Sequence, residues 1–125
     1  MKRVTPHLRE LLAETVTPLA VYQRLKALSP VRFLFESVTG GEQVARFSFL
    51  GAAPREIYRL YPDRLEVERD GRRSDLPGKP LAALRALVEG YSTPELPVPF
   101  AGGFVGTFGF DLVRLVERIP ARPPD

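Results

Sequence analysis

The chain of 125 residues contains no cysteine and no asparagine, and His7 is its single histidine. Without cysteine there is neither a disulfide framework nor a thiolate metal site, and one histidine alone does not hold a metal ion. No apolar run approaches the roughly 20 residues that a membrane-spanning helix needs. The N-terminus, MKRVTPHLRE, also lacks the apolar run of a signal peptide. We therefore expect a cytoplasmic protein without a membrane partner.

The chain also lacks a concentration of charge of either sign. Lysine and arginine number 18 against 15 aspartate and glutamate residues, which gives a formal net charge of +3. The basic residues cluster only at residues 69–73, whereas nucleic-acid binding requires a basic stripe, ideally interleaved with aromatic side chains. We therefore expect no nucleic-acid partner. The 44% hydrophobic and 26% charged contents are ordinary for a soluble globular chain, either one domain or part of a larger one.

Two β-prone runs flank Gly40-Gly41 within residues 33–51, FLFESVTGGEQVARFSFLG. A two-residue Gly-Gly connection is typical of a β-hairpin, because a type I′ or II′ turn needs positive φ angles that glycine adopts at low cost. Phenylalanines recur along both predicted strands, at positions 33, 35, 47 and 49. The hairpin therefore has one face that we expect to contact a core.

This loop length predicts a register for the hairpin. Ser37 should lie opposite Val44, and Phe35 opposite Arg46, so that all four side chains share one face. Glu36 should point to the other face, beside the residues at positions 45 and 47. A bulge or a three-residue loop would reverse this assignment of faces.

A helix is predicted to begin at Thr17-Pro18, where threonine caps the helix and proline occupies its first position. It should end before Pro30, because proline disfavours helical geometry in the preceding residue. Residues 4–12 fit either a helix or an extended edge segment. The expected apolar face of the helix consists of Val21, Tyr22, Leu25 and Leu28.

Residues 55–61 and 64–69 alternate between apolar and polar side chains, which predicts two strands with one buried face. Asp70-Gly71 is typical of a hairpin turn after the second strand. In that strand, the expected inward residues are Leu65 and Val67, and the expected solvated residues are Glu66 and Glu68.

Residues 79–91 predict a helix whose leucines recur at helical spacing and which Gly90 terminates. Residues 101–110 combine aromatic side chains with glycine at every third position, which we interpret as a strand closely approached by other groups. A short helix capped by Asp111 should follow. Together these patterns predict an α+β fold with a mainly antiparallel sheet and two to four helices.

Four segments of this sequence together resemble the N-terminal region of anthranilate synthase component I. They are Thr17-Pro18, residues 34–51, residues 99–114 and the proline-rich residues 119–125. The run Glu-Ser-Val-x-Gly-Gly-Glu…Arg-Phe-Ser-Phe-Leu-Gly is specific to that family. The run Gly-Gly-x-Val-Gly-x-Phe-Gly-x-Asp is shared with aminodeoxychorismate synthase component I. We expect residues 1–125 to be the front part of a longer protein whose chorismate-binding region lies outside this sequence.

The resemblance implies a mixed α/β sandwich and an enzymatic role for the full-length protein. That role is a lyase reaction that converts chorismate and ammonia or glutamine into anthranilate and pyruvate, the first step of tryptophan biosynthesis. The resemblance also implies Mg²⁺ held by residues outside this sequence and a glutamine amidotransferase subunit as partner. No catalytic or metal-binding residue is expected among these 125 residues, so that they should be inactive alone.

The resemblance further implies that this region carries part of the L-tryptophan feedback-inhibition site. The family's Leu-Leu-Glu-Ser motif falls on Leu34, Phe35, Glu36 and Ser37, and a basic residue of the next strand falls on Arg46. On the predicted register, Ser37 and Arg46 are the paired contacts, because a hydroxyl and a guanidinium suit a carboxylate or an amine. Glu36 belongs to the motif but points away on that register.

Two other hypotheses stay open at this point. The alternative to anthranilate synthase is the same region of aminodeoxychorismate synthase component I, in which bound tryptophan is structural. The chain is also compatible with a free-standing β-rich binding module, in which Arg46 makes an ion pair and Ser37 a backbone hydrogen bond.

Overall fold

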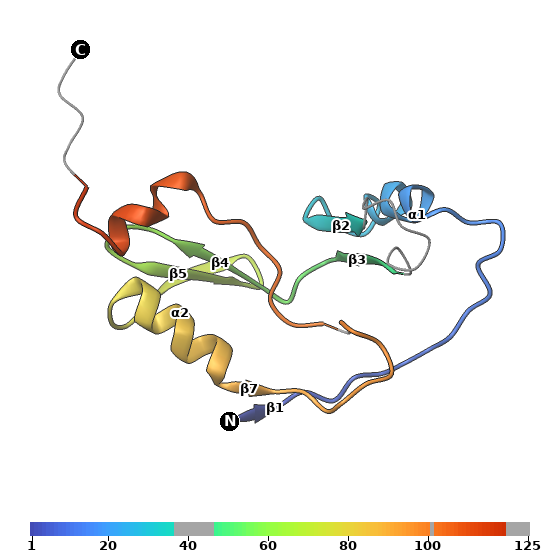
Figure 1. Cartoon of the computed structure of the whole chain (residues 1–125), viewed down its shortest axis with the longest axis horizontal. Coiled ribbons are helices and arrows are strands. Elements are labelled where there is room, and N and C mark those ends of the chain that lie inside the picture. The colour runs from blue at the N-terminus through green and yellow to red at the C-terminus, as the bar shows by residue number, and fades with distance from the viewer. Residues whose placement is uncertain (37–46, 101, 120–125) are drawn as a thin grey trace, which may run out of the picture. The chain divides into compact units, whose positions relative to one another are not determined.

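The computed structural model describes residues 1–36, 47–100 and 102–119, and these residues form an α+β structure (Figure 1). Contacts within the chain divide it into two units. Unit 1 consists of Met1–Thr5 and Glu56–Asp125, and unit 2 of Pro6–Arg55. The predicted fold class, helices combined with mainly antiparallel strands, is confirmed.

Unit 1 is built on an antiparallel sheet in the order β4 (Glu56–Leu60), β5 (Leu65–Arg69) and β6 (Arg72–Leu76). Both strands predicted from alternation, β4 and β5, are confirmed. The predicted turn connects β5 to β6, with φ angles of 50° at Asp70 and 74° at Gly71. Positive φ at both central residues is the geometry that a two-residue hairpin turn requires.

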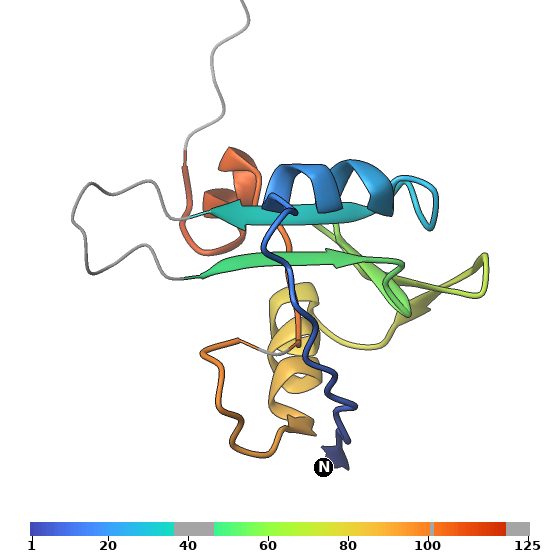
Figure 2. The same cartoon turned by 90° about the vertical axis from the view of Figure 1, so that its right-hand side faces the viewer.

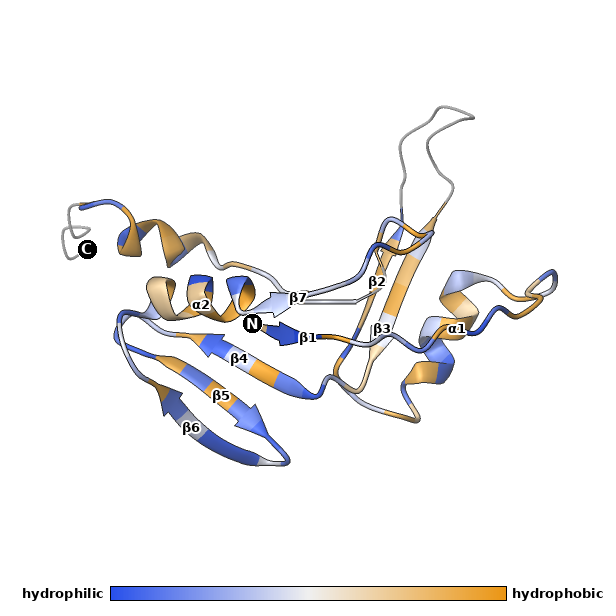
Figure 3. Ribbon diagram, turned by 90° about the horizontal axis from the view of Figure 1, so that it is seen from below, coloured by the Kyte–Doolittle hydropathy of each residue, from blue (hydrophilic) through white to orange (hydrophobic). Residues whose placement is uncertain are grey.

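The core of unit 1 lies on one face of β5, where Leu65 and Val67 are buried. Helix α2 (Pro80–Glu89) packs against β5 and β4, and lies along the sheet in Figure 1. The alternation of hydrophobic and hydrophilic residues along β5 is visible in Figure 3, where β6 is mostly hydrophilic. Gly90 ends α2 as predicted, although it keeps a right-handed φ of −72°. The leucines of the helix, at positions 81, 84 and 87, are half-buried, in keeping with the predicted apolar face, but no residue of α2 is fully buried.

The first residues of the chain pair with the segment that follows α2. Strand β1 (Lys2–Arg3) runs parallel to β7 (Tyr91–Ser92). The Lys2 amide donates to the Gly90 carbonyl at 2.7 Å, and the Val4 amide donates to the Ser92 carbonyl at 3.0 Å. Residues 4–12 are in neither a helix nor a strand, so neither of the two alternatives left open by the sequence describes them.

The glycine-rich segment differs from its prediction. Residues 102–109 contain no strand, and the short helix that follows is the 3₁₀ helix η1 (Phe110–Leu115). Gly102 and Gly103 have φ angles of +135° and +133°, which do not continue a ladder of extended residues. Glycine at every third position also does not match the two-residue period of a strand. Asp111 does not cap η1; its carboxylate lies 3.2 Å from the Arg114 Nε atom.

Unit 2 begins with helix α1 (Pro18–Leu25), and its predicted cap is confirmed. The Thr17 Oγ1 atom accepts a hydrogen bond from the Ala20 amide at 3.2 Å. The helix packs on the antiparallel strands β2 (Arg32–Glu36) and β3 (Ser48–Ala52) (Figure 2). The Arg32 guanidinium lies 4.6 Å from the centre of the Tyr22 ring. Leu28 lies beyond the helix and is exposed, so its predicted place on the apolar face is wrong.

The register predicted for the hairpin is also wrong. Phe35 lies opposite Phe49 rather than Arg46, and Glu36 lies opposite Ser48, a shift of three positions along the second strand. The predicted Gly40-Gly41 turn lies outside the described residues, as do Ser37 and Arg46.

The observed register places an aromatic ring over a glycine. Phe33 lies opposite Gly51, and a Cβ atom at Gly51 would overlap the Phe33 ring. The Phe33 and Phe35 ring centres are 5.1 Å apart, and those of Phe47 and Phe49 are 6.2 Å apart. Each of these ring pairs joins residues on the same strand segment, so the ring pairs do not select a register. The contact across the strands is that of the Phe33 ring with Gly51, which requires a residue without a side chain at that position.

Candidate functional site

Glu66 and Glu68 lie on the sheet face opposite Leu65 and Val67, but this face is not simply solvated. The Arg59 Nη1 atom lies 2.8 Å from a Glu68 carboxylate oxygen and 3.4 Å from a Glu66 oxygen. The Arg73 Nε atom lies 3.1 Å from the same Glu68 oxygen. The hydrogen bond from Arg59 lowers the pKa of Glu68. Both carboxylates lie beside guanidinium groups, and Glu68 is held ionised by them, which argues against a proton-sharing pair.

A second polar cluster, on the α2 face of the sheet, consists of Glu56, Tyr58 and Arg69. The Tyr58 hydroxyl donates to the Glu56 carboxylate, and the Arg69 Nε atom lies 2.6 Å from Glu56 Oε1. The hydrogen bond from Tyr58, followed by the contact with Arg69, lowers the pKa of Glu56. Burial and the bond to Glu56 raise the pKa of Tyr58 to about 12. The Tyr58 proton is thus fixed in place and is unsuited to acid–base transfer near neutral pH.

This cluster predicts how stability depends on pH. The contribution of Glu56 is complete above its ordinary pKa of 4.5 and is lost as the pH falls through its lowered value. The contribution of Tyr58 is complete below its ordinary pKa of 10 and is lost as the pH rises to about 12. Tyr58→Phe should abolish the alkaline loss and weaken the acid loss, because its hydroxyl is the main cause of the low Glu56 pKa.

The measurement is the free energy of unfolding from urea titrations across the pH range. Tyr61→Phe is the matched control, and it should keep both the acid and the alkaline loss of the wild type. A Tyr58→Phe variant with the wild-type pH profile would contradict the assignment.

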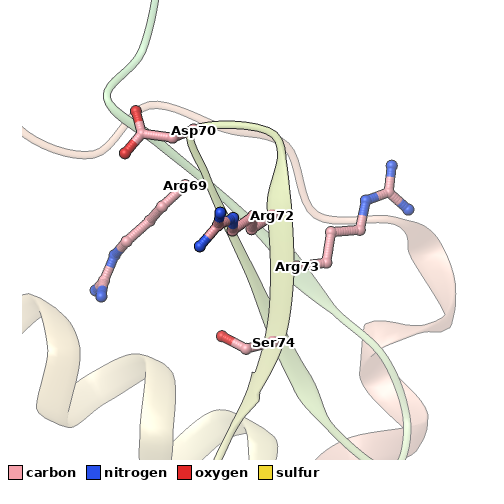
Figure 4. A pocket seen from close by; sticks show the side chains of 5 residues that line it. All are labelled: Arg69, Asp70, Arg72, Arg73 and Ser74. Carbon is pink, nitrogen blue, oxygen red and sulfur yellow. The ribbon is translucent and has the colours of Figure 1, made fainter.

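The turn between β5 and β6 borders a hollow that is open to solvent (Figure 4). The side chains of Arg69, Arg72 and Ser74 lie on one side of the hairpin, and Arg73 extends from the other side. The sequence showed this basic cluster but not its division between two faces, which follows from the pairing of the strands. The residues that line the hollow are Arg69, Asp70, Arg72, Arg73 and Ser74.

Glu36 is the one predicted site residue within the described part of the chain. It is exposed at the end of β2, and its cross-strand partner is Ser48 rather than the residues at positions 45 and 47. Ser48 is therefore a neighbour of the candidate site that the predicted register missed. The placement of Ser37 and Arg46 remains a prediction.

The described residues contain no group of three or more histidine, aspartate or glutamate side chains arranged to hold a metal ion. Residues 1–36, 47–100 and 102–119 thus offer no candidate ligand set for the Mg²⁺ that the resemblance implies. None of the helices in this part of the chain has the length and apolarity needed to cross a membrane.

Comparison with known proteins identifies the relatives of this chain. The anthranilate synthase component 1 of Thermus thermophilus is 40% identical over 127 residues, which cover the whole chain and 26% of that protein. The protein of the same name from Mycobacterium tuberculosis is 39% identical over 130 residues, covering 98% of the chain and 25% of the relative. This chain is related to the N-terminal region of anthranilate synthase component 1.

The predicted resemblance to anthranilate synthase component 1 is thereby confirmed. The protein of the same name from Acetivibrio thermocellus is 35% identical over 126 residues, covering 98% of the chain. The chain spans about a quarter of the length of these relatives. No family model and no solved structure matches the chain.

Proposed function

We propose that this chain serves as the N-terminal regulatory and structural part of an anthranilate synthase component 1. The observation that supports the proposal is identity of 35–40% with proteins of that name over nearly all of the chain. The whole protein would convert chorismate and ammonia or glutamine into anthranilate and pyruvate, a lyase reaction that begins tryptophan biosynthesis.

In this proposal the chemistry resides outside the 125 residues. Chorismate and Mg²⁺ would bind in the remaining part of the protein, and a glutamine amidotransferase subunit would supply ammonia in the cytoplasm. The chain alone would have no turnover with chorismate. Measurable anthranilate formation by residues 1–125 alone would contradict the proposal that catalysis occurs in the rest of the protein.

The proposed regulatory role rests on an L-tryptophan site that includes Glu36, Ser37 and Arg46. The chemistry of the three side chains suits an amino acid, because a carboxylate accepts from an ammonium group and a guanidinium donates to a carboxylate. Glu36 is exposed at a strand end and has no ion pair with any residue of the described ranges, so that its carboxylate is available. Tryptophan would then regulate activity by binding one conformation more tightly than another.

The test is inhibition of the longest natural form of the protein by L-tryptophan. Ser37→Ala, Arg46→Ala and Glu36→Ala should each raise the inhibition constant about tenfold, which corresponds to the loss of one charge-assisted hydrogen bond. Ser92→Ala, the same truncation as Ser37→Ala at a residue of unit 1, should leave inhibition unchanged. Wild-type inhibition in all three site variants would overturn the site assignment.

The product of the same enzyme separates the two chorismate-dependent hypotheses. We expect anthranilate, because the relatives carry that name, whereas aminodeoxychorismate would favour the alternative suggested by the glycine-rich motif. A free-standing binding module would instead show neither product. It would unfold cooperatively as a monomer in a calorimeter.

A further inference from the structure

Two arginines directly oppose each other at the turn of the β5–β6 hairpin. Arg69 and Arg72 are cross-strand partners on either side of Asp70-Gly71. Like charges at directly opposite positions destabilise a sheet. In natural proteins, residues that conflict with local stability are found mainly at functional sites. A pair of opposed arginines is therefore a reason to look for a ligand at this turn.

The ion pairs of the sheet leave one of its arginines without a partner. Arg69 lies 2.6 Å from Glu56, and Arg73 lies 3.1 Å from Glu68 on the opposite face. Arg72 makes no ion pair with any residue that the structure describes. Its guanidinium thus faces a like charge and retains its full set of five N–H donors.

A hydroxyl donor lies on the same side of the hairpin. Ser74 is two positions beyond Arg72 on β6, so the two side chains share a face, and Figure 4 shows both pointing to the side that carries Arg69. These three side chains border the solvent-open hollow at the turn. Arg69 contacts Glu56 through Nε and is also hydrogen-bonded to Tyr58, so that it has fewer free donors to offer a second acceptor than Arg72 has.

We propose that this hollow binds an oxyanion, a phosphate or carboxylate group, through the guanidinium groups of Arg69 and Arg72 and the Ser74 hydroxyl. A guanidinium fork matches the paired oxygens of either group, and a charge-assisted hydrogen bond is about twice as strong as a neutral one. The bound anion also offsets the repulsion between the two arginines. The site lies in unit 1 and is independent of the proposed tryptophan site in unit 2.

The test is hydrogen–deuterium exchange of the peptide spanning residues 65–76 in the longest natural form of the protein. Sodium phosphate and sodium acetate are titrated separately at constant ionic strength, with chloride as the balancing anion. We expect at least one of them to slow exchange in this peptide saturably. Saturation by phosphate alone assigns a phosphate group, and saturation by acetate assigns a carboxylate. Absence of a saturable response to either anion overturns the proposal.

Two variants and a control sharpen this test. Arg72→Ala should weaken the apparent affinity for the anion about tenfold, whereas Arg85→Ala, which removes an equally exposed charge from α2, should not change it. Arg72→Glu should raise Tm in chloride buffer without phosphate or acetate, because it creates an opposite-charge pair with Arg69, and should abolish the response to phosphate or acetate. Retention of the wild-type response in Arg72→Ala or Arg72→Glu also overturns the proposal.

Discussion

Leu65→Ala is expected to lower the free energy of unfolding of this chain by about 2–5 kcal/mol, the usual range for truncating a buried leucine. Leu65 is 0% exposed and faces α2 from the central strand β5. The loss combines the transfer free energy of the removed methyl groups with the cost of the cavity that remains. Leu65 and Val67 are the most deeply buried side chains in the described part of the chain, so that few neighbours can compensate.

Circular dichroism during urea titration measures this change. Leu28→Ala is the matched control, because Leu28 is 72% exposed and the same truncation should cost less than about 0.5 kcal/mol. If the wild-type chain is less stable than the expected loss, Leu65→Ala is unfolded in water from the start. Equal losses in the two variants would contradict the position of the core.

Phe104→Ala is expected to cost about 1–3 kcal/mol, because it removes two aromatic contacts worth about 0.5–1.5 kcal/mol each, although the residue is 42% exposed. The Phe104 ring centre lies 5.9 Å from that of Tyr58 and 5.6 Å from that of Tyr91. These contacts attach the strandless segment 102–109 to β4 and β7. Without the Phe104 ring, this segment loses its aromatic attachment to the sheet.

The control for Phe104 is Phe110, six residues further along the chain and 94% exposed. Phe110→Ala removes the same atoms and should change the free energy of unfolding by less than about 0.5 kcal/mol. Increased proteolysis near residues 102–109 in Phe104→Ala, but not in Phe110→Ala, would report the detachment independently. A Phe104→Ala variant as stable as Phe110→Ala would show that the aromatic contacts do not stabilise the unit.

The sheet of unit 1 was predictable because its sequence signals agree with one another. Alternation placed Leu65 and Val67 on one face, and Asp70-Gly71 supplied the turn that their strand needs. The same alternation could not show that Glu66 and Glu68 are neutralised, because their partner Arg59 comes from another strand. Cross-strand charge pairing requires the register, which alternation within one strand does not contain.

The register of the β2–β3 hairpin shows where the sequence was insufficient. The length of the loop is inferred from a Gly-Gly pair, whereas the observed pairing places Phe33 over Gly51, a fit that turn residues do not reveal. The turn residues themselves lie outside the described part of the chain. In the observed register, the cross-strand neighbour of Glu36 in the candidate site is Ser48. Ser37 and Arg46 stay predictions that rest on the family resemblance.

The pairing of β1 with β7 makes unit 2 an insertion within unit 1. Lys2 cannot pair with Tyr91 until unit 2 and α2, which lie between them in the sequence, have been synthesised. During synthesis, unit 2 (Pro6–Arg55) is therefore complete well before unit 1. Domains generally fold as units during synthesis. Unit 2 can therefore fold before unit 1. Strand β1 has no partner strand until Ser92 of β7 has left the ribosomal exit tunnel.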